Sequence, residues 1–516
     1  MNPRTFKRRA RHAVYGLLAC GFALGAWAAA APGPPTAEGV SASTAASDLP
    51  DMGTPADSTL TKADELQLGR MIFRGLRDQG QLLEDPEVSE YLQALGTRLA
   101  SQTGEERDYT YFMVKDRAVN AFALYGGFIG VNAGLMLLTE NESQLASVLG
   151  HETAHVKQRH LARAIQAQSK NAMTSTAALL AALLIGAATG ADSQAMIGAF
   201  AVTQGIAMQQ SINFTRSEEA EADRVGITLL AGAGFDTYAM ADFFEGLART
   251  EGVSEAGPLD LLRDHPVTRE RIAEARVRAA EYPRVQPASS FSYLLMRERV
   301  RVLTAPPQAG ALAYYRGIAA TRPLTMAEQY GQALAQMRNN QAPAAVTTLS
   351  RLLDARPDST PLYAALGQAL LAAGENDAAL ERFARAAKLF PRNVPIIVRY
   401  SEALMQCGQP GKAHELLLDL FNNVEPTPDQ IRLTALAASS AGDAADAYYY
   451  MGEYHLSGGD LALAMQQLEL ALSTPGLSSV QQQRFRARLD EERGWAREQA
   501  AARRKSGSGG EGGPGG

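Results

Sequence analysis

Apolar residues recur at helical spacing through most of this chain, and the clearest example lies near residue 150. Leu145, Val148, Leu149 and Val156 are separated by intervals that place them on one face of an α-helix. The pattern predicts a long, half-buried helix that continues through residues 151–155.

The C-terminal part repeats a helical pattern every 34 residues, as Pro357 and Pro391 or Gly374 and Gly408 show. The first unit matches a tetratricopeptide repeat at Tyr363, Leu366, Gly367, Leu370, Gly374, Ala379, Phe383, Ala386 and Pro391. Such repeats stack into a solenoid with a concave binding face, whereas a plain helical bundle is the alternative. The longer interval to Gly459 predicts an unpaired helix near residues 429–441.

The N-terminus has the pattern of a secretory signal peptide. Five basic residues and no acidic ones accompany an apolar stretch over residues 13–31, and Ala26-Trp27-Ala28 offers a cleavage site. A lipid anchor at Cys20 and an uncleaved helix are the alternatives. Cleavage would remove the five positive charges and make the net charge of −6 more negative, which argues against nucleic-acid binding. Cys407 would then be the only cysteine, so no intramolecular disulfide is expected.

Two uncharged, Ala-rich runs lie in the N-terminal half of the chain, at residues 172–191 and 195–208. The first is long enough to cross a membrane, but it contains Thr, Ser and Gly and is only mildly apolar. We therefore expect a helical hairpin that packs on protein or lies at a membrane surface, in preference to a membrane span.

The run from His151 to His155 is an HExxH motif in helix-forming sequence. Residues four apart share a helix face, so His151 and His155 can bind one Zn²⁺, and Glu152 can act as a general base toward a water molecule. A structural zinc site needs no such base. The motif therefore predicts a zinc peptidase.

Catalytic zinc usually has three protein ligands, and an acidic helical segment at residues 217–226 can supply the third. Glu218, Glu219 and Glu221 are all candidates, and spacing alone does not choose among them. Glu219 and Asp223 share a helix face, so one can bind metal while the other accepts a hydrogen bond from a ligating imidazole.

HExxH followed about sixty residues later by ExEADxxG resembles the metallopeptidase family of the CAAX prenyl proteases and the HtpX-type envelope proteases. The resemblance implies one Zn²⁺ per subunit, with Glu219 as the third ligand and Asp223 beside it. Residues 118–131 resemble the family segment NAFAxPGGxIxV, although Tyr125 replaces the usual Pro and leaves the shape of the turn open. The implied fold class is mainly α: an α+β zincin-type peptidase domain followed by an α-helical solenoid.

His265-Pro266, followed by Arg271-Ile272, is similar to the family pattern HPxxxxRI. His265 could donate a hydrogen bond to the oxyanion, occupy the open zinc position and keep the enzyme latent, or be an ordinary loop histidine. His160 is nine residues after His151 and near the opposite helix face, so we expect it to be structural or at the surface.

Glu152 is expected to take a proton from water and deliver it to the leaving amine. Residues 127–132 are expected to form a short strand to which an extended substrate adds, a weakly selective mode that suits unfolded proteins.

Taken over the whole chain, the resemblance implies a periplasmic protein of a Gram-negative bacterium. It would support outer-membrane protein assembly and degrade misassembled proteins, with a chaperone-like role and with the solenoid docking the assembly machinery. A scaffold with incidental proteolysis and a zinc hydrolase of cell-wall material are the alternatives. The expected segments are a signal peptide (1–30), a linker (31–58), a zinc metallopeptidase domain (59–285), a helical connector (286–324), the solenoid (325–497) and a disordered Gly-rich tail (498–516).

Overall fold

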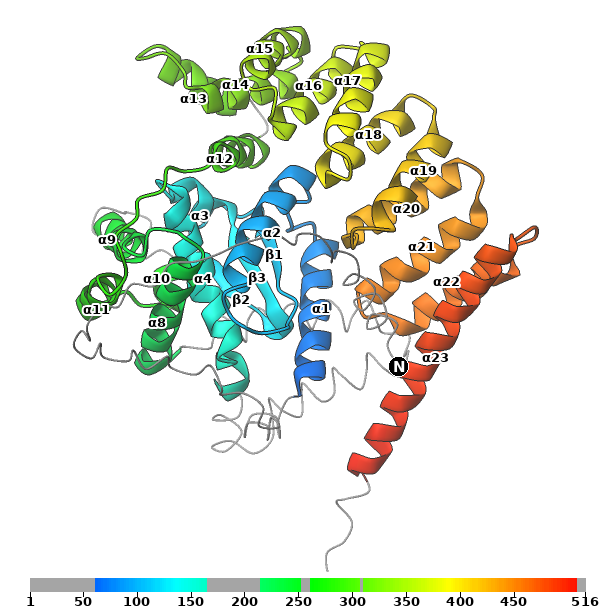
Figure 1. The fold of residues 1–516 in the computed structure, drawn as a ribbon, viewed down its shortest axis with the longest axis horizontal. Helices are drawn as coiled ribbons and strands as arrows, with labels where there is room; N and C mark the ends of the chain where they lie inside the picture. Colours follow the sequence, from blue (N-terminus) through cyan, green and yellow to red (C-terminus); the bar gives the residue numbers. More distant parts are fainter. Residues whose placement is uncertain (1–60, 165–213, 252–259, 307–309, 508–516) are drawn as a thin grey trace, which may run out of the picture. The chain divides into compact units, whose positions relative to one another are not determined.

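The computed structural model describes residues 61–164, 214–251, 260–306 and 310–507 (Figure 1). The expected signal peptide, the linker and the two Ala-rich runs between 172 and 208 lie outside the described residues. No helix within the described ranges combines the length and the apolar character needed to cross a membrane.

The peptidase region contains a three-stranded sheet of β1 (Thr110–Val114), β2 (Ala121–Ala123) and β3 (Phe128–Asn132). The strand order is β1-β3-β2, with β1 parallel and β2 antiparallel to β3. The expectation that the segment at 127–132 pairs with substrate is therefore wrong, because both edges of β3 are already paired within the sheet. β1 was not predicted, because its pairing with β3 joins residues distant in the chain. β2 is the edge strand beside β3.

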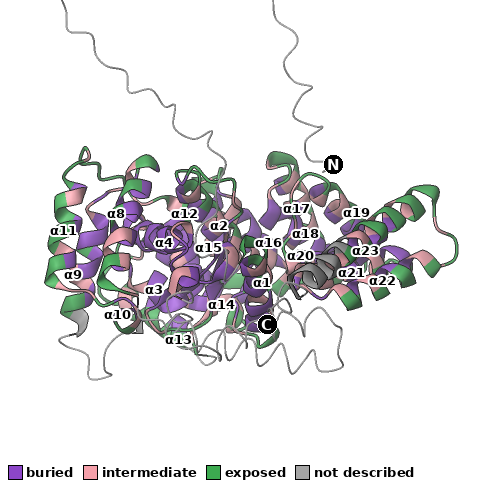
Figure 2. Ribbon diagram, turned by 90° about the horizontal axis from the view of Figure 1, so that it is seen from below, coloured by how far each residue is buried: buried purple, intermediate pink, exposed green. Residues whose placement is uncertain are grey.

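Helices surround this sheet (Figure 1). They are α1 (Lys62–Asp78), α2 (Pro86–Ala100), α3 (Ala133–Leu138), α4 (Glu142–Lys157), α8 (Arg216–Gly232), α9 (Ala239–Glu251), α10 (Asp260–Asp264) and α11 (Arg269–Ala279), with the short 3₁₀ turn η3 (Tyr125–Gly127) before β3. α4 is the predicted helix, but it is buried from Ser143 to Val156 instead of half-buried (Figure 2). It packs against α2, α8, α9 and the sheet, so no face is left to solvent.

The close approach of α4 and α8 depends on two glycines. A Cβ on Gly150 would lie 3.3 Å from the backbone oxygen of Gly226, and a Cβ on Gly226 would lie 3.1 Å from the backbone nitrogen of His151. Side chains at these positions would push the helices apart. This contact brings the acidic first turns of α8 next to the histidines of α4.

The C-terminal region is the predicted solenoid, in which successive antiparallel helices pack on their neighbours (Figure 1). Its helices and those of the connector are α12 (Phe291–Leu303), α13 (Gly310–Ala319), α14 (Met326–Arg338), α15 (Ala342–Ala355), α16 (Thr360–Ala372), α17 (Asn376–Leu389), α18 (Val394–Gln406), α19 (Pro410–Phe421), α20 (Pro428–Ser440), α21 (Ala444–Ser457), α22 (Leu461–Ser473) and α23 (Ser479–Gly507). The recurrent Gly374 and Gly408 each follow a helix with positive φ, 81° and 73°. This conformation costs glycine little and explains the 34-residue spacing.

The expected fold class, mainly α with an α+β peptidase region before a helical solenoid, is confirmed. The expected tail is wrong in its first part, because α23 continues to Gly507. Residues 498–505 are Glu, Gln, Ala, Arg and Lys, which favour helix, and the glycines begin only at Gly507. Residues 508–516 lie outside the described residues.

Four charged residues join α2 to α12 and α18, and we call them the junction cluster: the buried Asp85, Glu87 and Arg299, and the half-buried Arg399. Arg299 donates to Asp85 at 2.7 Å and to Glu87 at 3.0 Å. Arg399 donates to the same two carboxylates at 2.8 and 2.7 Å. Asp85 also caps α2 through the N–H of Val88. Each acid of the cluster therefore meets two guanidinium groups.

Candidate metal centre

His151 and His155 project from one face of α4, one turn apart. The helix begins at Asn141, whose side chain accepts a hydrogen bond from the N–H of Gln144 and so orients the first turn. The Nε2 atoms of His151 and His155 lie 3.0 Å apart, and both rings are buried. The local helical geometry therefore places the two rings as the HExxH spacing predicts.

The three candidate carboxylates of α8 have different surroundings. Glu218 closes a capping box, because its carboxylate accepts the N–H of Thr215 at 2.9 Å. Glu221 lies 2.9 Å from Arg163, on the outer side of the site. Glu219 is buried and lies 3.5 Å from His155 Nε2 and 3.6 Å from His151 Nε2. Of the three, Glu219 is the carboxylate that faces both rings.

His265 enters the same cluster from the segment after α10. Its Nδ1 atom lies 2.8 Å from Glu219 and 3.4 Å from His151 Nε2. Two hydrogen bonds hold this segment near the start of β2: Leu261 N–H donates to Val119 O at 3.1 Å, and Asn120 donates to Asp264 at 3.0 Å. His265 is therefore held in place from its own chain segment and is not a loose loop residue.

The four side chains have the spacing that a tetrahedral zinc site requires. Ligands about 2.0–2.1 Å from a zinc ion lie about 3.3 Å from one another. The atoms of His151, His155, Glu219 and His265 are separated by 2.8 to 3.6 Å at the measured contacts. Three imidazoles and one carboxylate are also a donor set that zinc prefers. The residues present therefore fit a zinc ion.

The outer nitrogens of the two HExxH rings have separate supports. His151 Nδ1 lies 2.9 Å from Asp223, which in turn binds Arg271 at 2.8 Å. His155 Nδ1 lies 2.9 Å from His160 Nδ1, and the other nitrogen of His160 lies 3.3 Å from Glu221. Partners of this kind orient a ligating ring and fix its tautomer.

His160 and Arg271 also support the site. Of the two expectations for His160, the structural one agrees with the structure and the surface one does not, since the residue is fully buried against His155. The helical period does not apply to it, because the chain turns at Arg159, which has a φ of 52°. Arg271 lies 2.7 Å from Glu219 as well as binding Asp223. Arg271 is part of the HPxxxxRI pattern, and this resemblance is the sequence feature that could have indicated its position in the site.

The electrostatic environment favours the metal-binding forms of His155 and Glu219 but the protonated form of His265. Burial, together with His151, lowers the pKa of His155 well below its usual range, so the ring is neutral. Burial opposes ionisation of Glu219, but His265, His151 and Arg271 outweigh it and lower its pKa to about 2. Burial also opposes protonation of His265, but Glu219 and Glu152 raise its pKa to about 9. Binding of a cation would therefore release a proton from His265.

Glu152 lies beside this cluster and is almost completely buried. Neither of its carboxylate oxygens has a well-aligned hydrogen bond among the described residues, and the nearest ring nitrogen of His265 is 3.6 Å away. Burial raises the pKa of Glu152 above its ordinary value. An acid whose pKa is raised toward neutrality is suited to exchanging protons with a reactant.

The comparisons with known proteins agree with this geometry. Residues 86–279 match Peptidase family M48, and residues 370–437 match a tetratricopeptide repeat family. A beta-barrel assembly-enhancing protease of Escherichia coli O157:H7 is 34% identical over 451 residues, which cover 86% of this chain and 91% of the relative. The chain belongs to the family of beta-barrel assembly-enhancing proteases.

Two further relatives show how far this similarity extends. A Vibrio cholerae serotype O1 protein assigned to the beta-barrel assembly-enhancing proteases is 41% identical over 318 residues, which cover 60% of this chain and 64% of that protein. The metalloprotease LoiP of Escherichia coli K12 is 34% identical over 199 residues, 37% of this chain and 72% of LoiP. The expected zinc metalloendopeptidase class is confirmed by this membership.

Proposed function

We propose that this member of the beta-barrel assembly-enhancing protease family is a periplasmic zinc endopeptidase that hydrolyses misassembled outer-membrane proteins. The observation that carries the proposal is the convergence of His151, His155 and Glu219 within 3.0 to 3.6 Å of one another, beside the buried Glu152. These three residues would hold one zinc ion per subunit, and Asp223 would orient the ring of His151.

The zinc ion and the protein side chains would supply different parts of the hydrolysis. When bound, zinc supplies a Lewis acid that lowers the pKa of water and polarises a peptide carbonyl. Glu152 takes the proton of the attacking water and transfers it to the departing amine, and its burial beside the cluster supports this role. Arg271 keeps Glu219 and Asp223 ionised and in place.

The substrate would bind in an extended conformation along β2. Since β1 and β2 occupy both sides of β3, the outer edge of β2 is the available partner for strand addition next to the site. α4 packs against β2, so a chain bound there would pass close to Glu152. Recognition through backbone hydrogen bonds selects an unpaired strand, which folded proteins rarely offer.

His265 acts in this proposal as a latch that must leave before cleavage. Its Nδ1 atom lies among the ligand atoms, 2.8 Å from Glu219 and 3.4 Å from His151 Nε2, where the attacking water would otherwise lie. This position supports the latent arrangement over the role of oxyanion donor. The alternative catalytic role of His265 would require the same ring to turn toward the substrate after the segment moves.

The solenoid would direct the protease to its substrates. The E. coli relative, 34% identical, is named for beta-barrel assembly, and repeats of this type commonly bind proteins. We extend this to binding of the outer-membrane assembly machinery and to a chaperone-like role. Export through the N-terminal segment would bring the chain to the periplasm. A lipid anchor at Cys20 is the alternative, and the proposal includes peripheral contact with the membrane.

Cleavage of an unfolded protein tests the proposal. Casein would be incubated with the zinc-loaded full chain, with the Glu152→Gln and His265→Ala variants, and with wild type plus a chelator. We expect no cleavage with Glu152→Gln or chelator, and faster cleavage with His265→Ala. Undiminished cleavage by Glu152→Gln would contradict the proposal.

Two further measurements separate the alternative functions. In an outer-membrane assembly assay, full activity of Glu152→Gln would indicate a scaffold with incidental proteolysis. Release of fragments from purified cell wall, without cleavage of casein, would indicate a hydrolase of envelope material.

A further inference from the structure

A second group of one histidine and two acids lies in the solenoid. His414 of α19 and Asp443 and Asp446 at the start of α21 each offer one ligand atom, and these atoms lie within 4.8 Å of one another. His414 and Asp446 are buried, and Asp443 is half-buried. Apart from the metal centre, no other group of this kind occurs in the described parts of the chain.

Asp446 is contacted from two neighbouring helices. Its Oδ2 atom lies 3.4 Å from His414 Nε2 of α19, and its Oδ1 atom accepts hydrogen bonds from Arg484 and Gln481 of α23. Asp443 caps α21 by accepting the N–H of Asp446 at 2.9 Å, and its other oxygen accepts from Gln481 at 3.2 Å. These contacts hold both carboxylates in place and leave the Oδ2 atom of Asp446 toward the histidine.

The ring of His414 lacks a hydrogen-bond partner at Nε2. The residue is 7% exposed, and this buried nitrogen has no well-aligned hydrogen bond among the described residues. Its separation of 3.4 Å from Asp446 Oδ2 exceeds the usual length of an N–H···O hydrogen bond, roughly 2.7–3.2 Å. Ligands of a tetrahedral zinc ion lie about 3.3 Å apart, which matches this separation. The distance therefore favours a cation shared by the ring and the carboxylate over a direct hydrogen bond.

We propose that His414, Asp443 and Asp446 form a second metal site, which binds a divalent transition-metal ion such as Zn²⁺. The inference does not depend on the proposed peptidase function. An imidazole with two carboxylates is a donor set that suits zinc, whereas Ca²⁺ and Mg²⁺ take oxygen ligands and would leave His414 without a partner. The ion would connect α19 to the first turn of α21, two helices that α20 separates in the chain.

The charges around the site determine how strongly it binds a cation. Burial opposes ionisation of Asp446, but His414 and Arg484 outweigh it and lower its pKa, so the carboxylate is ionised and available to a cation. Arg484 is itself held over the rings of Tyr449 and Phe485, at 4.5 and 5.1 Å. Since Arg484 offsets one of the two negative charges, we expect weaker binding than at the metal centre. The first equivalent of Zn²⁺ should therefore fill the metal centre, and the second site should fill only when the ion is in excess.

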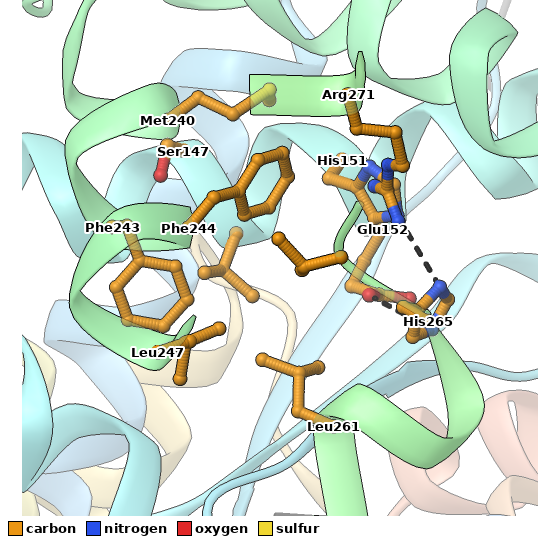
Figure 3. Close-up of a pocket in the computed structure, with 12 residues that line it drawn as sticks. Ser147, His151, Glu152, Met240, Phe243, Phe244, Leu247, Leu261, His265 and Arg271 are labelled. Atoms are coloured by element: carbon orange, nitrogen blue, oxygen red, sulfur yellow. Dashed lines mark hydrogen bonds and ion pairs between the residues drawn. The ribbon is translucent and has the colours of Figure 1, made fainter. Parts of the chain in front are cut away.

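The surroundings of the second site favour a structural role over a catalytic one. At the metal centre, the carboxylate of Glu152 lies beside His151 and His265 (Figure 3). At the second site, the neighbouring side chains from α23 are Arg484 and Gln481, and neither can take a proton from water. The ion would therefore stabilise the C-terminal part of the solenoid, because its binding free energy adds to that of folding.

Zn²⁺ binding to the full chain carrying Glu219→Gln isolates the second site, because this substitution removes a ligand of the metal centre. Equilibrium dialysis against excess Zn²⁺ should show one bound ion per chain, and the ion should raise the melting temperature. Adding His414→Gln should abolish both effects, and adding Asp443→Asn, which keeps the cap of α21, should reduce both. His455→Gln is the matched control, since this histidine of α21 belongs to neither ligand group, and it should leave both effects unchanged.

The outcomes of this test are separate from those of the peptidase assay. Equal Zn²⁺ binding with and without His414→Gln would overturn the second site and leave His414 as an ion-pair partner of Asp446. Equal stabilisation by Ca²⁺ would also overturn it, because the imidazole would then not be a ligand. Circular dichroism identifies variants that fold, and Asp443→Asn carries the test in the same way if His414→Gln does not fold. Absence of casein cleavage by wild type would contradict the proposed function and leave this result unchanged.

Discussion

The metal centre and the junction cluster both gather buried charged or titratable groups from distant parts of the chain, but they are built differently. In the junction cluster, Arg299 and Arg399 neutralise Asp85 and Glu87 at 2.7 to 3.0 Å. In the metal centre, ring nitrogens face one another at 3.0 and 3.4 Å around a single carboxylate. Lone pairs brought this close require a proton or a cation between them.

This contrast separates a structural from a functional group of buried charges. The acids and guanidinium groups of the junction cluster pair with one another and connect α2 with α12 and α18. The metal centre leaves Glu152 buried without a well-aligned hydrogen bond and points four ligand atoms at one place. Removing a charge should therefore reduce stability at the junction and reduce activity at the metal centre.

Glu152→Gln should give the largest change in activity. Loss of the general base lowers the rate of hydrolysis by roughly 10²–10⁴-fold. Because Gln is uncharged and has nearly the same volume, the melting temperature should stay the same or rise. Casein cleavage and thermal unfolding of the same samples measure both effects. A large drop in melting temperature would mean that Glu152 has a structural role like that of the junction acids.

Arg299→Met should give the largest change in stability. It leaves Asp85 and Glu87 buried with one guanidinium instead of two, and breaking such a buried pair costs about 3–5 kcal/mol. Urea unfolding followed by helical signal measures this cost. Arg356→Met is the control, because its partner Asp358 is exposed and surface pairs contribute about 0–1 kcal/mol. Equal effects of the two substitutions would contradict the structural role of the junction cluster.

His160→Ala should weaken zinc binding without removing a ligand. The ring supports His155 from its outer nitrogen, and loss of such a partner lowers metal affinity roughly 10–100-fold. Competition with a chromophoric chelator measures the affinity, and His455→Ala in the solenoid controls for loss of a histidine. Unchanged affinity in His160→Ala would show that the contact only fills space.

Glu84→Gln should have the smallest effect, visible only in its pH dependence. Glu84 is exposed, but partial desolvation of its carboxyl group and the neighbouring Asp429 of α20 raise its pKa from 4.5 to about 7. The folded chain then holds a proton that the unfolded chain releases between these pH values, so stability falls as pH rises through this window. The melting temperature of Glu84→Gln should exceed that of wild type increasingly from pH 5 to pH 8. The exposed Glu106→Gln should show no such trend, and a parallel trend would contradict the assignment.

The features that could be predicted from the sequence are those determined by residues close together in the chain. The helical period is sufficient to bring His151 and His155 together, and the 34-residue interval follows from a glycine that ends each repeat. Glu219 could not be chosen from spacing, because three acids within about one helical turn are equal candidates until the contacts of Glu218 with Thr215 and of Glu221 with Arg163 are known. The resemblance to known metallopeptidases supplied that choice.

The features that were predicted wrongly or not at all depend mainly on contacts between segments distant in the chain. β3 was expected at an edge because nothing in its own sequence indicates that β1 pairs with it. The surface alternative for His160 rested on a helical period that the local turn at Arg159 interrupts, whereas the structural alternative agrees with its burial. The junction cluster has no motif at all, since its four members come from three helices and a capping position.

The most direct test of the account is zinc stoichiometry and affinity in three matched variants of α8: Glu218→Gln, Glu219→Gln and Glu221→Gln. Each removes one carboxylate of the same acidic segment with almost no change in volume. We expect wild type and Glu218→Gln to bind one zinc ion per chain equally well, Glu221→Gln to bind it more weakly, and Glu219→Gln to lose it. Retention of one zinc ion by Glu219→Gln at wild-type affinity would contradict the proposed metal centre.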